Sequence, residues 1–183
     1  DGEDRITLGA SLLRESGIYI SVNPKDIASP VTISKDGFKY CFYMLPFTEP
    51  VKMRCYNGFE EAASYTDTYR LLIAEAKKSL DIKACNILIS HCFVTGCTVS
   101  ESESPIFIGG SCEISADVFS DFDYVALGHL HSPQKAGTNC RYSGSPLKYS
   151  FDEQKQNKSI TVIDADEKNI TTSVYNYTPL HNM

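Results

Sequence analysis

Three of the four histidines in this chain stand where metal ligation would require them. An apolar run (124–127) ends in Gly128, and His129 and His131 follow it, one residue apart. A third histidine, His91, ends a second apolar run. Neutral imidazole is the commonest nitrogen ligand for zinc, manganese and iron, so three convergent histidines would supply most of a metal site.

The elements around these histidines favour convergence. Both apolar runs are typical of buried strands, and ligands of α/β sheets gather outside the carboxyl ends of strands. Residues i and i+2 of an extended segment project to the same side, so His129 and His131 are expected to face one site while Leu130 packs into the core. Gly128 removes a side chain where the backbone must pass close to that site. The fourth histidine, His181, has no such context, and we interpret it as structural.

The acidic residues do not complete a hydrolytic centre. Two-metal hydrolysis needs a carboxylate that bridges ions about 3.5–4 Å apart and a group that protonates the leaving oxygen. Asp121, Asp123 and Asp152 are available, but none stands at a strand end. We interpret Asp152 and Glu153 as a solvated turn, and the acidic "SESES" (100–104) as a solvated loop tip rather than a gate over a groove. The residues alone predict part of a metal centre.

The rest of the chain predicts an α/β fold with a mixed β-sheet, flanking helices and a terminal β meander. Hydrophobic periodicity predicts helices over 5–16 and 67–80, a short helix that begins after Ser115, and a loop over 45–61. Runs rich in β-forming residues predict strands over 18–22, 85–91, 123–129, 140–146, 158–166 and 170–177, and a hairpin about Asp36 and Gly37.

Composition limits the classes of function. With 183 residues and a net charge of −6, the chain is a poor candidate for a free-standing nucleic-acid binder, although bound cations would relax that restriction. The seven cysteines have no C-x-x-C spacing and indicate a reducing cytoplasm. A zinc site on Cys92 and Cys97 is a weak alternative. No apolar run approaches the roughly 18 residues of a membrane span.

Three stretches carry a resemblance to a known family: "ILISHCFVTG", "GGSCEISADVFSDFDYVALGHLHSPQ" and "YSGSPLKYSFDE". In this order they resemble the SbcD branch of the calcineurin-like metallophosphoesterases, over Asp1 to Met183 and most strongly over 85–153. The G-H-x-H pattern alone indicates only the superfamily. The resemblance implies that 1–183 is the C-terminal half of a layered phosphoesterase sandwich, without the N-terminal metal-binding motifs or the capping domain.

Site residues follow from the same resemblance. His91 and His129 would bind one metal ion, and His131 would bind the other. Asp1 matches the last residue of the family's Gly-Asn-His-Asp motif and would orient a catalytic histidine that lies upstream of this chain, so no catalytic residue is assigned within it.

The resemblance also implies an activity and its partners. The cofactors would be two divalent ions, usually Mn²⁺. The reaction would be hydrolysis of DNA phosphodiesters, as a 3′ to 5′ exonuclease and a hairpin endonuclease, together with an SbcC ATPase partner. A homodimer stays open, because the sequence does not decide whether the chain dimerises. Because half of the ligands are missing, this chain alone is expected to be inactive.

Two other functions stay open at this point. One is a calcineurin-like phosphoesterase that acts on phosphoproteins or small nucleotides. The other is a non-catalytic module that serves as a scaffold for SbcC. Three aromatic residues near the motifs, Tyr142, Tyr149 and Phe151, could stack on DNA bases, although packing within the fold is the expectation for them.

Overall fold

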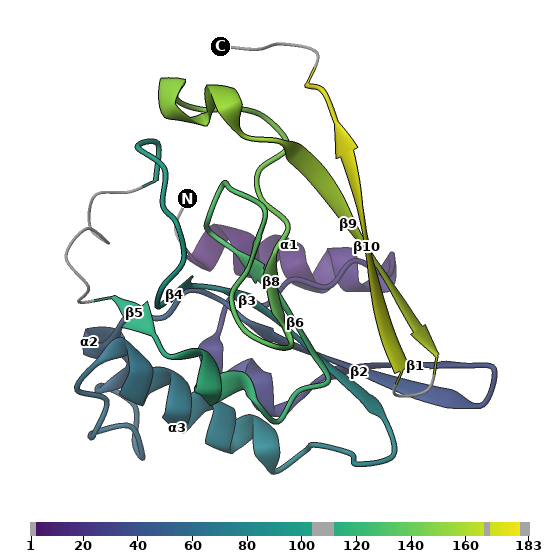
Figure 1. Ribbon diagram of the computed structural model, residues 1–183. Coiled ribbons are helices and arrows are strands. Elements are labelled where there is room, and N and C mark those ends of the chain that lie inside the picture. The colour runs from purple at the N-terminus through teal and green to yellow at the C-terminus, as the bar shows by residue number, and fades with distance from the viewer. Residues whose placement is uncertain (1–2, 104–111, 167–168, 180–183) are drawn as a thin grey trace.

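The computed structural model describes residues 3–103, 112–166 and 169–179, and these form a central six-stranded mixed sheet (Figure 1). In spatial order the strands are β1 (Val31–Lys35), β2 (Phe38–Leu45), β3 (Cys85–His91), β6 (Tyr124–Gly128), β8 (Cys140–Tyr142) and β7 (Gln134–Lys135). The four central strands, β2, β3, β6 and β8, are parallel, and β1 and β7 pair antiparallel at the two edges. The predicted mixed α/β class is confirmed.

The first two strands form the predicted hairpin. Asp36 and Gly37 both have positive φ, 52° and 86°, as a tight turn between antiparallel strands requires. Lys35 pairs with Phe38 across this turn, and Val31 pairs with Phe42 at the other end. The Asp-Gly signal therefore fixes the register of this edge of the sheet.

One face of the sheet is covered by α3 (Tyr65–Lys77). The helix begins two residues earlier than periodicity predicts, because Ser64 and Asp67 form a capping box. Four residues spaced along one side of the helix are buried in the same core as strand residues of the sheet: Tyr69, Leu72, Ile73 and Ala76. This packing holds β3 and β6 in place beneath the helix.

The opposite face of the sheet is partly covered by β9 (Lys158–Asp166) and β10 (Asn169–Tyr177), an antiparallel pair. Side chains of this pair, Ile163, Ala165 and Ile170, pack against a small second core on β3 and β6. The predicted terminal meander is thus an antiparallel pair, whereas β8 joins β6 in the central sheet.

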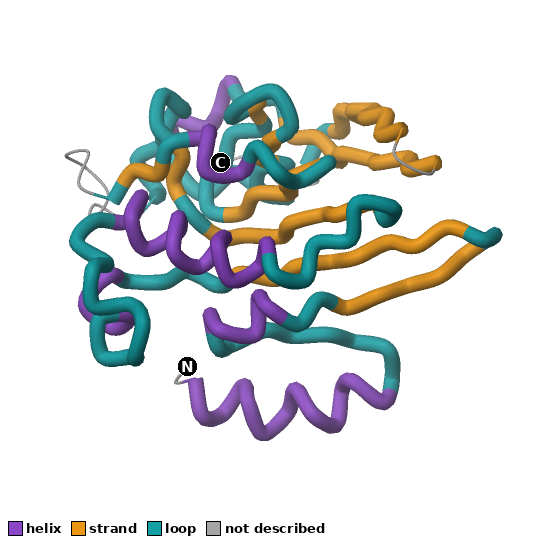
Figure 2. The backbone as a smooth tube through the Cα atoms, turned by 90° about the horizontal axis from the view of Figure 1, so that it is seen from below, coloured by secondary structure: helices purple, strands orange, loops and turns teal. Residues whose placement is uncertain are grey.

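Two predictions about the N-terminal third were wrong. Residues 18–22 form no strand, and Ile18, Tyr19 and Ile20 are all exposed, because no strand in the described ranges pairs with them. The expected loop 45–61 contains a short helix, α2 (Pro50–Met53), whose proline occupies its first turn. The predicted first helix is confirmed as α1 (Glu3–Glu15), and Figure 2 shows it apart from α3, beyond the 3-10 helix η1 (Pro24–Ala28).

Short elements complete the part of the fold that borders the histidines. The strands β4 (Phe93–Val94) and β5 (Glu113–Ile114) pair with each other, and the 3-10 helix η3 (Ala116–Phe119) follows Ser115, as predicted. A second 3-10 helix, η4 (Phe151–Lys155), precedes β9. No helix in the part of the chain that the structure describes is long and apolar enough to cross a membrane.

Candidate metal centre

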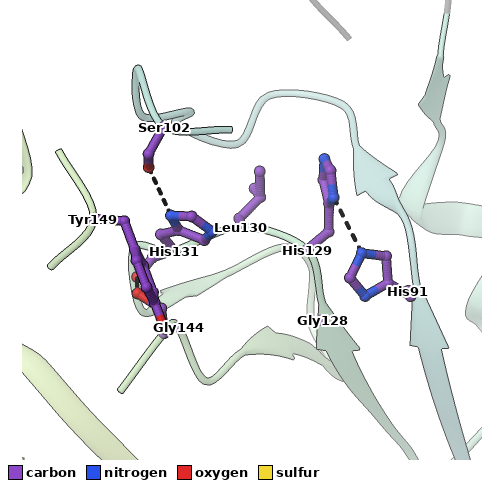
Figure 3. A pocket seen from close by; sticks show the side chains of 9 residues that line it. His91, Ser102, Gly128, His129, Leu130, His131, Gly144 and Tyr149 are labelled. Carbon is purple, nitrogen blue, oxygen red and sulfur yellow. Dashed lines mark hydrogen bonds between the residues drawn. The ribbon is translucent and has the colours of Figure 1, made fainter. Parts of the chain in front are cut away.

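Two adjacent strand ends meet at one cavity. β3 ends at His91 and β6 ends at Gly128, and these two residues are register partners in the parallel pair. A cavity of about 610 Å³ opens there and is lined by His91, the segment 128–131, Ser102, Gly144, Ser145 and Tyr149 (Figure 3). The expectation that the carboxyl ends of both strands face one site is confirmed.

His91 and His129 point at each other across this cavity. Nδ1 of His129 lies 3.2 Å from Nε2 of His91, and the two rings meet edge to face with centroids 5.1 Å apart (Figure 3). His129 has a φ of 112°, a backbone conformation that side-chain-bearing residues rarely adopt. The regular strand therefore ends at Gly128, and a local turn of the backbone directs the His129 ring toward His91.

The spacing of these two nitrogens fits a shared cation. Two imidazole nitrogens that each bind one ion at about 2.1 Å, at angles of about 90–110°, lie roughly 3.0–3.4 Å apart. The observed 3.2 Å falls inside this range. Two nitrogens are fewer than the ligands of a complete site, and the described residues hold no group of three or more His, Cys, Asp or Glu side chains placed to bind a metal ion.

The surroundings keep both rings neutral. Burial lowers the pKa of His91. Burial also lowers the pKa of His129, and the nearby charges of His91 and His131 lower it further, to about 4. A neutral imidazole carries one ring lone pair, so at neutral pH each ring has one nitrogen that can bind a metal ion. The two facing nitrogens are within hydrogen-bond distance, and in that hydrogen bond one of them carries the proton that the other accepts.

Gly128 makes the approach of the two strand ends possible. A Cβ at this position would stand 3.1 Å from Nδ1 of His91, closer than such atoms ordinarily approach. The predicted close passage of the backbone is confirmed, and the group that it approaches is the His91 ring.

Buried tyrosines fix the segment that follows β3. The Tyr69 hydroxyl donates to the carbonyl of His91 at 3.3 Å. The Tyr142 hydroxyl donates to the carbonyl of Cys92 at 2.7 Å and accepts from the amide of Val94 at 2.9 Å. Both tyrosines are fully buried, so the backbone that carries His91 is tied to the core on two sides.

His131 lies in the same cavity but has a different environment. Its Nδ1 lies 2.9 Å from Oε1 of Glu153 and 2.7 Å from Oγ of Ser102. Its amide donates to Glu103 at 2.5 Å. Leu130, between the two histidines, is buried as predicted. Figure 3 shows the second ring nitrogen of His131 on the side away from Ser102.

Two predictions about acidic segments were right for Glu101 and Asp152, which are exposed, and wrong for one residue in each segment. Glu153 is fully buried, and its carboxylate receives hydrogen bonds from Lys158 and Ser102 and contacts the ring of His131. Glu103, in the acidic segment expected to be a loop tip, is also buried and accepts from the amides of Ser100 and His131. Their signal in the sequence was weak, because both carboxylates meet His131 only through contacts between distant segments.

Lys158, at the start of β9, is the other residue that sequence reasoning missed. Its side chain is fully buried, and Nζ lies 2.8 Å from Oε2 of Glu153. The same ammonium also donates to the carbonyl of His131 at 3.0 Å, to Ser145 at 2.9 Å and to Gln156 at 2.9 Å. Burial alone would raise the pKa of Glu153, but the hydrogen bonds from Lys158, Ser102, His131 and the Tyr149 amide lower it to about 2.

Ser102, His131 and Glu153 do not form a serine-hydrolase triad. In such a triad the histidine contacts the serine through one ring nitrogen and the carboxylate through the other. Here both partners lie at Nδ1, and the Ser102 hydroxyl donates to Glu153. The arrangement leaves Nε2 of His131 without a hydrogen bond among the described residues, and a nitrogen lone pair suits a metal better than a nucleophilic serine.

The aromatic residues and cysteines that the sequence singled out differ in burial. Tyr142 is a core residue, as expected, whereas Tyr149 and Phe151 are 51% and 81% exposed. The Tyr149 ring packs against the His131 ring, with centroids 5.2 Å apart. The seven cysteines, all within the described residues, are thiols rather than disulfides, and Cys41 and Cys85 are buried in strands as predicted. Asp1 and His181 lie outside the described residues.

No model of a known protein family matches this chain. The chain is 31% identical over 184 aligned residues to the SbcD subunit of the SbcCD nuclease of Staphylococcus saprophyticus, covering 100% of this chain and 48% of that protein. It is also 31% identical to the protein of the same name from Staphylococcus epidermidis, over 96% of this chain and 46% of that protein.

These matches confirm the resemblance to SbcD nuclease subunits. The chain is similar to them along its whole length, and it spans about half the length of the curated relatives it matches. The mixed sheet with one helical layer and one terminal strand pair is compatible with half of a calcineurin-like phosphoesterase domain.

Proposed function

We propose that this chain is the histidine-bearing part of a metal-dependent DNA nuclease of the SbcD type, residues 1–183 forming one partial metallophosphoesterase domain. The observation that carries the proposal is the convergence of His91 and His129, 3.2 Å apart at the ends of two adjacent parallel strands. The similarity to SbcD subunits over the whole chain supports the substrate class.

Each histidine has a separate role in this proposal. Nε2 of His91 and Nδ1 of His129 hold one divalent cation, and Nε2 of His131 holds a second. We propose Mn²⁺ as the ion. When bound, a pair of such ions makes water a nucleophile at neutral pH and stabilises charge on the phosphate. The residues of this chain keep the ligating nitrogens neutral and hold them at fixed positions around an open cavity.

The chain alone is proposed to be inactive. Among the described residues, two carboxylates contact the histidines, Glu103 and Glu153, and both are engaged by His131. A bridging carboxylate and a proton donor for the leaving oxygen would come from the length of an SbcD subunit that this chain does not span.

The test compares two proteins on end-labelled duplex and hairpin DNA with Mn²⁺. The 183-residue chain is expected to cleave neither substrate faster than buffer with Mn²⁺. A longer chain that joins these residues to the remaining SbcD length is expected to cleave both, and to lose that activity on His129→Ala. Cleavage by the 183-residue chain that His129→Ala abolishes would contradict its inactivity. No cleavage by the longer chain would contradict the nuclease function.

An SbcC-like ATPase partner is part of the same proposal, and the name of the complex to which the relatives belong, SbcCD, supports it. The longer chain is expected to co-purify with SbcC from the same organism. Light scattering on the longer chain without SbcC distinguishes a monomer from a homodimer, which the sequence leaves open.

A further inference from the structure

A buried ion pair, Glu153 and Lys158, lies next to the candidate ligand His131, and neither of its members is a candidate ligand. Glu153 and Lys158 are both fully buried, with Nζ and Oε2 2.8 Å apart. Moving two charges out of water costs free energy that their attraction only partly restores, so a buried pair is a weak source of stability. Stability alone therefore does not explain the buried pair, and the groups that it contacts indicate another role.

Both members of the pair hold the same histidine. Glu153 contacts Nδ1 of the His131 ring at 2.9 Å, and Lys158 donates to the His131 carbonyl at 3.0 Å. The Ser145 amide donates to the same carbonyl at 3.0 Å, and Glu103 accepts from the His131 amide. Within the described residues, every polar group of His131 except Nε2 is thereby engaged.

We propose that Glu153, held in its ionised form by Lys158, is a positioning residue that keeps the proton of His131 on Nδ1 and presents the Nε2 lone pair to the cavity. A carboxylate only accepts hydrogen bonds, so the ring nitrogen facing it must carry the proton. Ligating histidines ordinarily have such a carboxylate or carbonyl behind them, which fixes the tautomer and the ring orientation. The use of Nε2 as a ligand rests on the proposed function; the tautomer does not.

Ser102 determines what happens to the His131 tautomer when the Glu153 carboxylate is removed. Its hydroxyl donates to Glu153 and lies 2.7 Å from Nδ1 of His131. Without Glu153 this hydroxyl is free to donate to Nδ1 instead. The His131 proton would then occupy Nε2 and block the side that faces the cavity.

The experiment reads the tautomer directly. The metal-free, ¹⁵N-labelled 183-residue chain is studied by long-range ¹H–¹⁵N NMR near pH 8, above the ordinary histidine pKa of about 6.5. His131 is assigned with a His131→Gln variant. We expect protonated Nδ1 and unprotonated Nε2 in the unchanged chain, and the reverse in Glu153→Leu/Lys158→Met. The paired substitution removes both buried charges, so neither is left without its partner.

Two further variants control the result. Glu75→Leu/Lys78→Met makes the same exchange at a solvent-accessible pair on and just after α3 and is expected to leave the His131 tautomer unchanged. Ser102→Ala keeps Glu153 and is expected to retain the proton on Nδ1. If the double variant does not fold, the tautomer of His131 in the unchanged chain and in Ser102→Ala still tests whether Glu153 holds the proton on Nδ1.

The proposal is overturned if His131 of the unchanged chain carries its proton on Nε2 or on both nitrogens. It is also overturned if the tautomer persists in a folded Glu153→Leu/Lys158→Met variant, as judged by circular dichroism. The expected tautomer together with no cleavage by the longer chain would support this inference and contradict the nuclease function, so the two failures are distinguishable.

Discussion

Nδ1 of His129 and Nε2 of His91 lie 3.2 Å apart at the ends of two parallel strands that are direct neighbours. The relationship depends on a positive φ at His129 and on the missing side chain of Gly128. Each of these features is unfavourable for extending strand β6 beyond Gly128. They are explained together if the strand ends exist to bring two imidazole nitrogens to one point.

Gly128→Ala is expected to weaken metal binding while the fold is kept. The added Cβ would stand 3.1 Å from Nδ1 of His91, so the ring must shift by a few tenths of an ångström. Changes beside metal-ligating histidines typically cost about 10- to 100-fold in metal affinity, and we expect the lower end of this range. Isothermal titration with Zn²⁺, which binds nitrogen ligands more tightly than Mn²⁺, measures the change.

A matched variant tests whether the effect is local. Gly137→Ala would place its Cβ 3.4 Å from the Ala116 side chain, an ordinary contact outside the cavity lining. It is expected to leave Zn²⁺ affinity unchanged. Equal losses of affinity in the two variants would show that the Gly128 result reflects general destabilisation.

Lys158→Met alone is expected to destabilise the chain by about 3–5 kcal/mol, because it leaves the Glu153 carboxylate buried without its counter-charge. The double variant Glu153→Leu/Lys158→Met is expected to lose much less, since both charges are removed together. Urea unfolding followed by circular dichroism measures the free energies of unfolding. A double variant no more stable than Lys158→Met would argue against direct coupling of the two charges.

Acid is expected to destabilise the chain through Glu153. Its pKa is about 2 in the folded chain, against an ordinary value of 4.5. A carboxylate with a depressed pKa contributes stability above its unfolded pKa and loses it as the pH falls through the folded value. The contribution, on the order of 3 kcal/mol, should therefore disappear between about pH 4.5 and 2.

Comparison with the double variant isolates this contribution from that of the exposed carboxylates. The free energy of unfolding of Glu153→Leu/Lys158→Met should fall less steeply over the same pH range than that of the unchanged chain. Parallel curves would mean that Glu153 has an ordinary pKa in the folded chain.

The elements that sequence reasoning predicted are those encoded by neighbouring residues. The α3 stripe, the Asp36–Gly37 turn and the apolar run of β3 each lie within one short segment, and all three are present. The strand expected over 18–22 is absent because β-forming residues make a strand only where a partner strand is available.

In the site too, features set by residues close in the sequence were predicted, whereas contacts between distant segments were not. The strand-end positions of His91 and the 129–131 motif followed from the sequence. The roles of Glu103 and Glu153 did not, because these carboxylates meet His131 from positions 28 and 22 residues away along the chain. A charged residue in a polar segment is ordinarily solvated, and only the folded arrangement distinguishes the buried exceptions.

The most direct test of the central claim is a Mn²⁺ titration of the 183-residue chain followed by NMR of its histidine ring resonances. Mn²⁺ is paramagnetic and broadens the signals of the groups that bind it. We predict that the His91 and His129 rings broaden together at the lowest Mn²⁺ concentrations, and that His129→Ala removes the effect at His91. Broadening confined to acidic surface residues, with both histidine rings unaffected, would contradict the account.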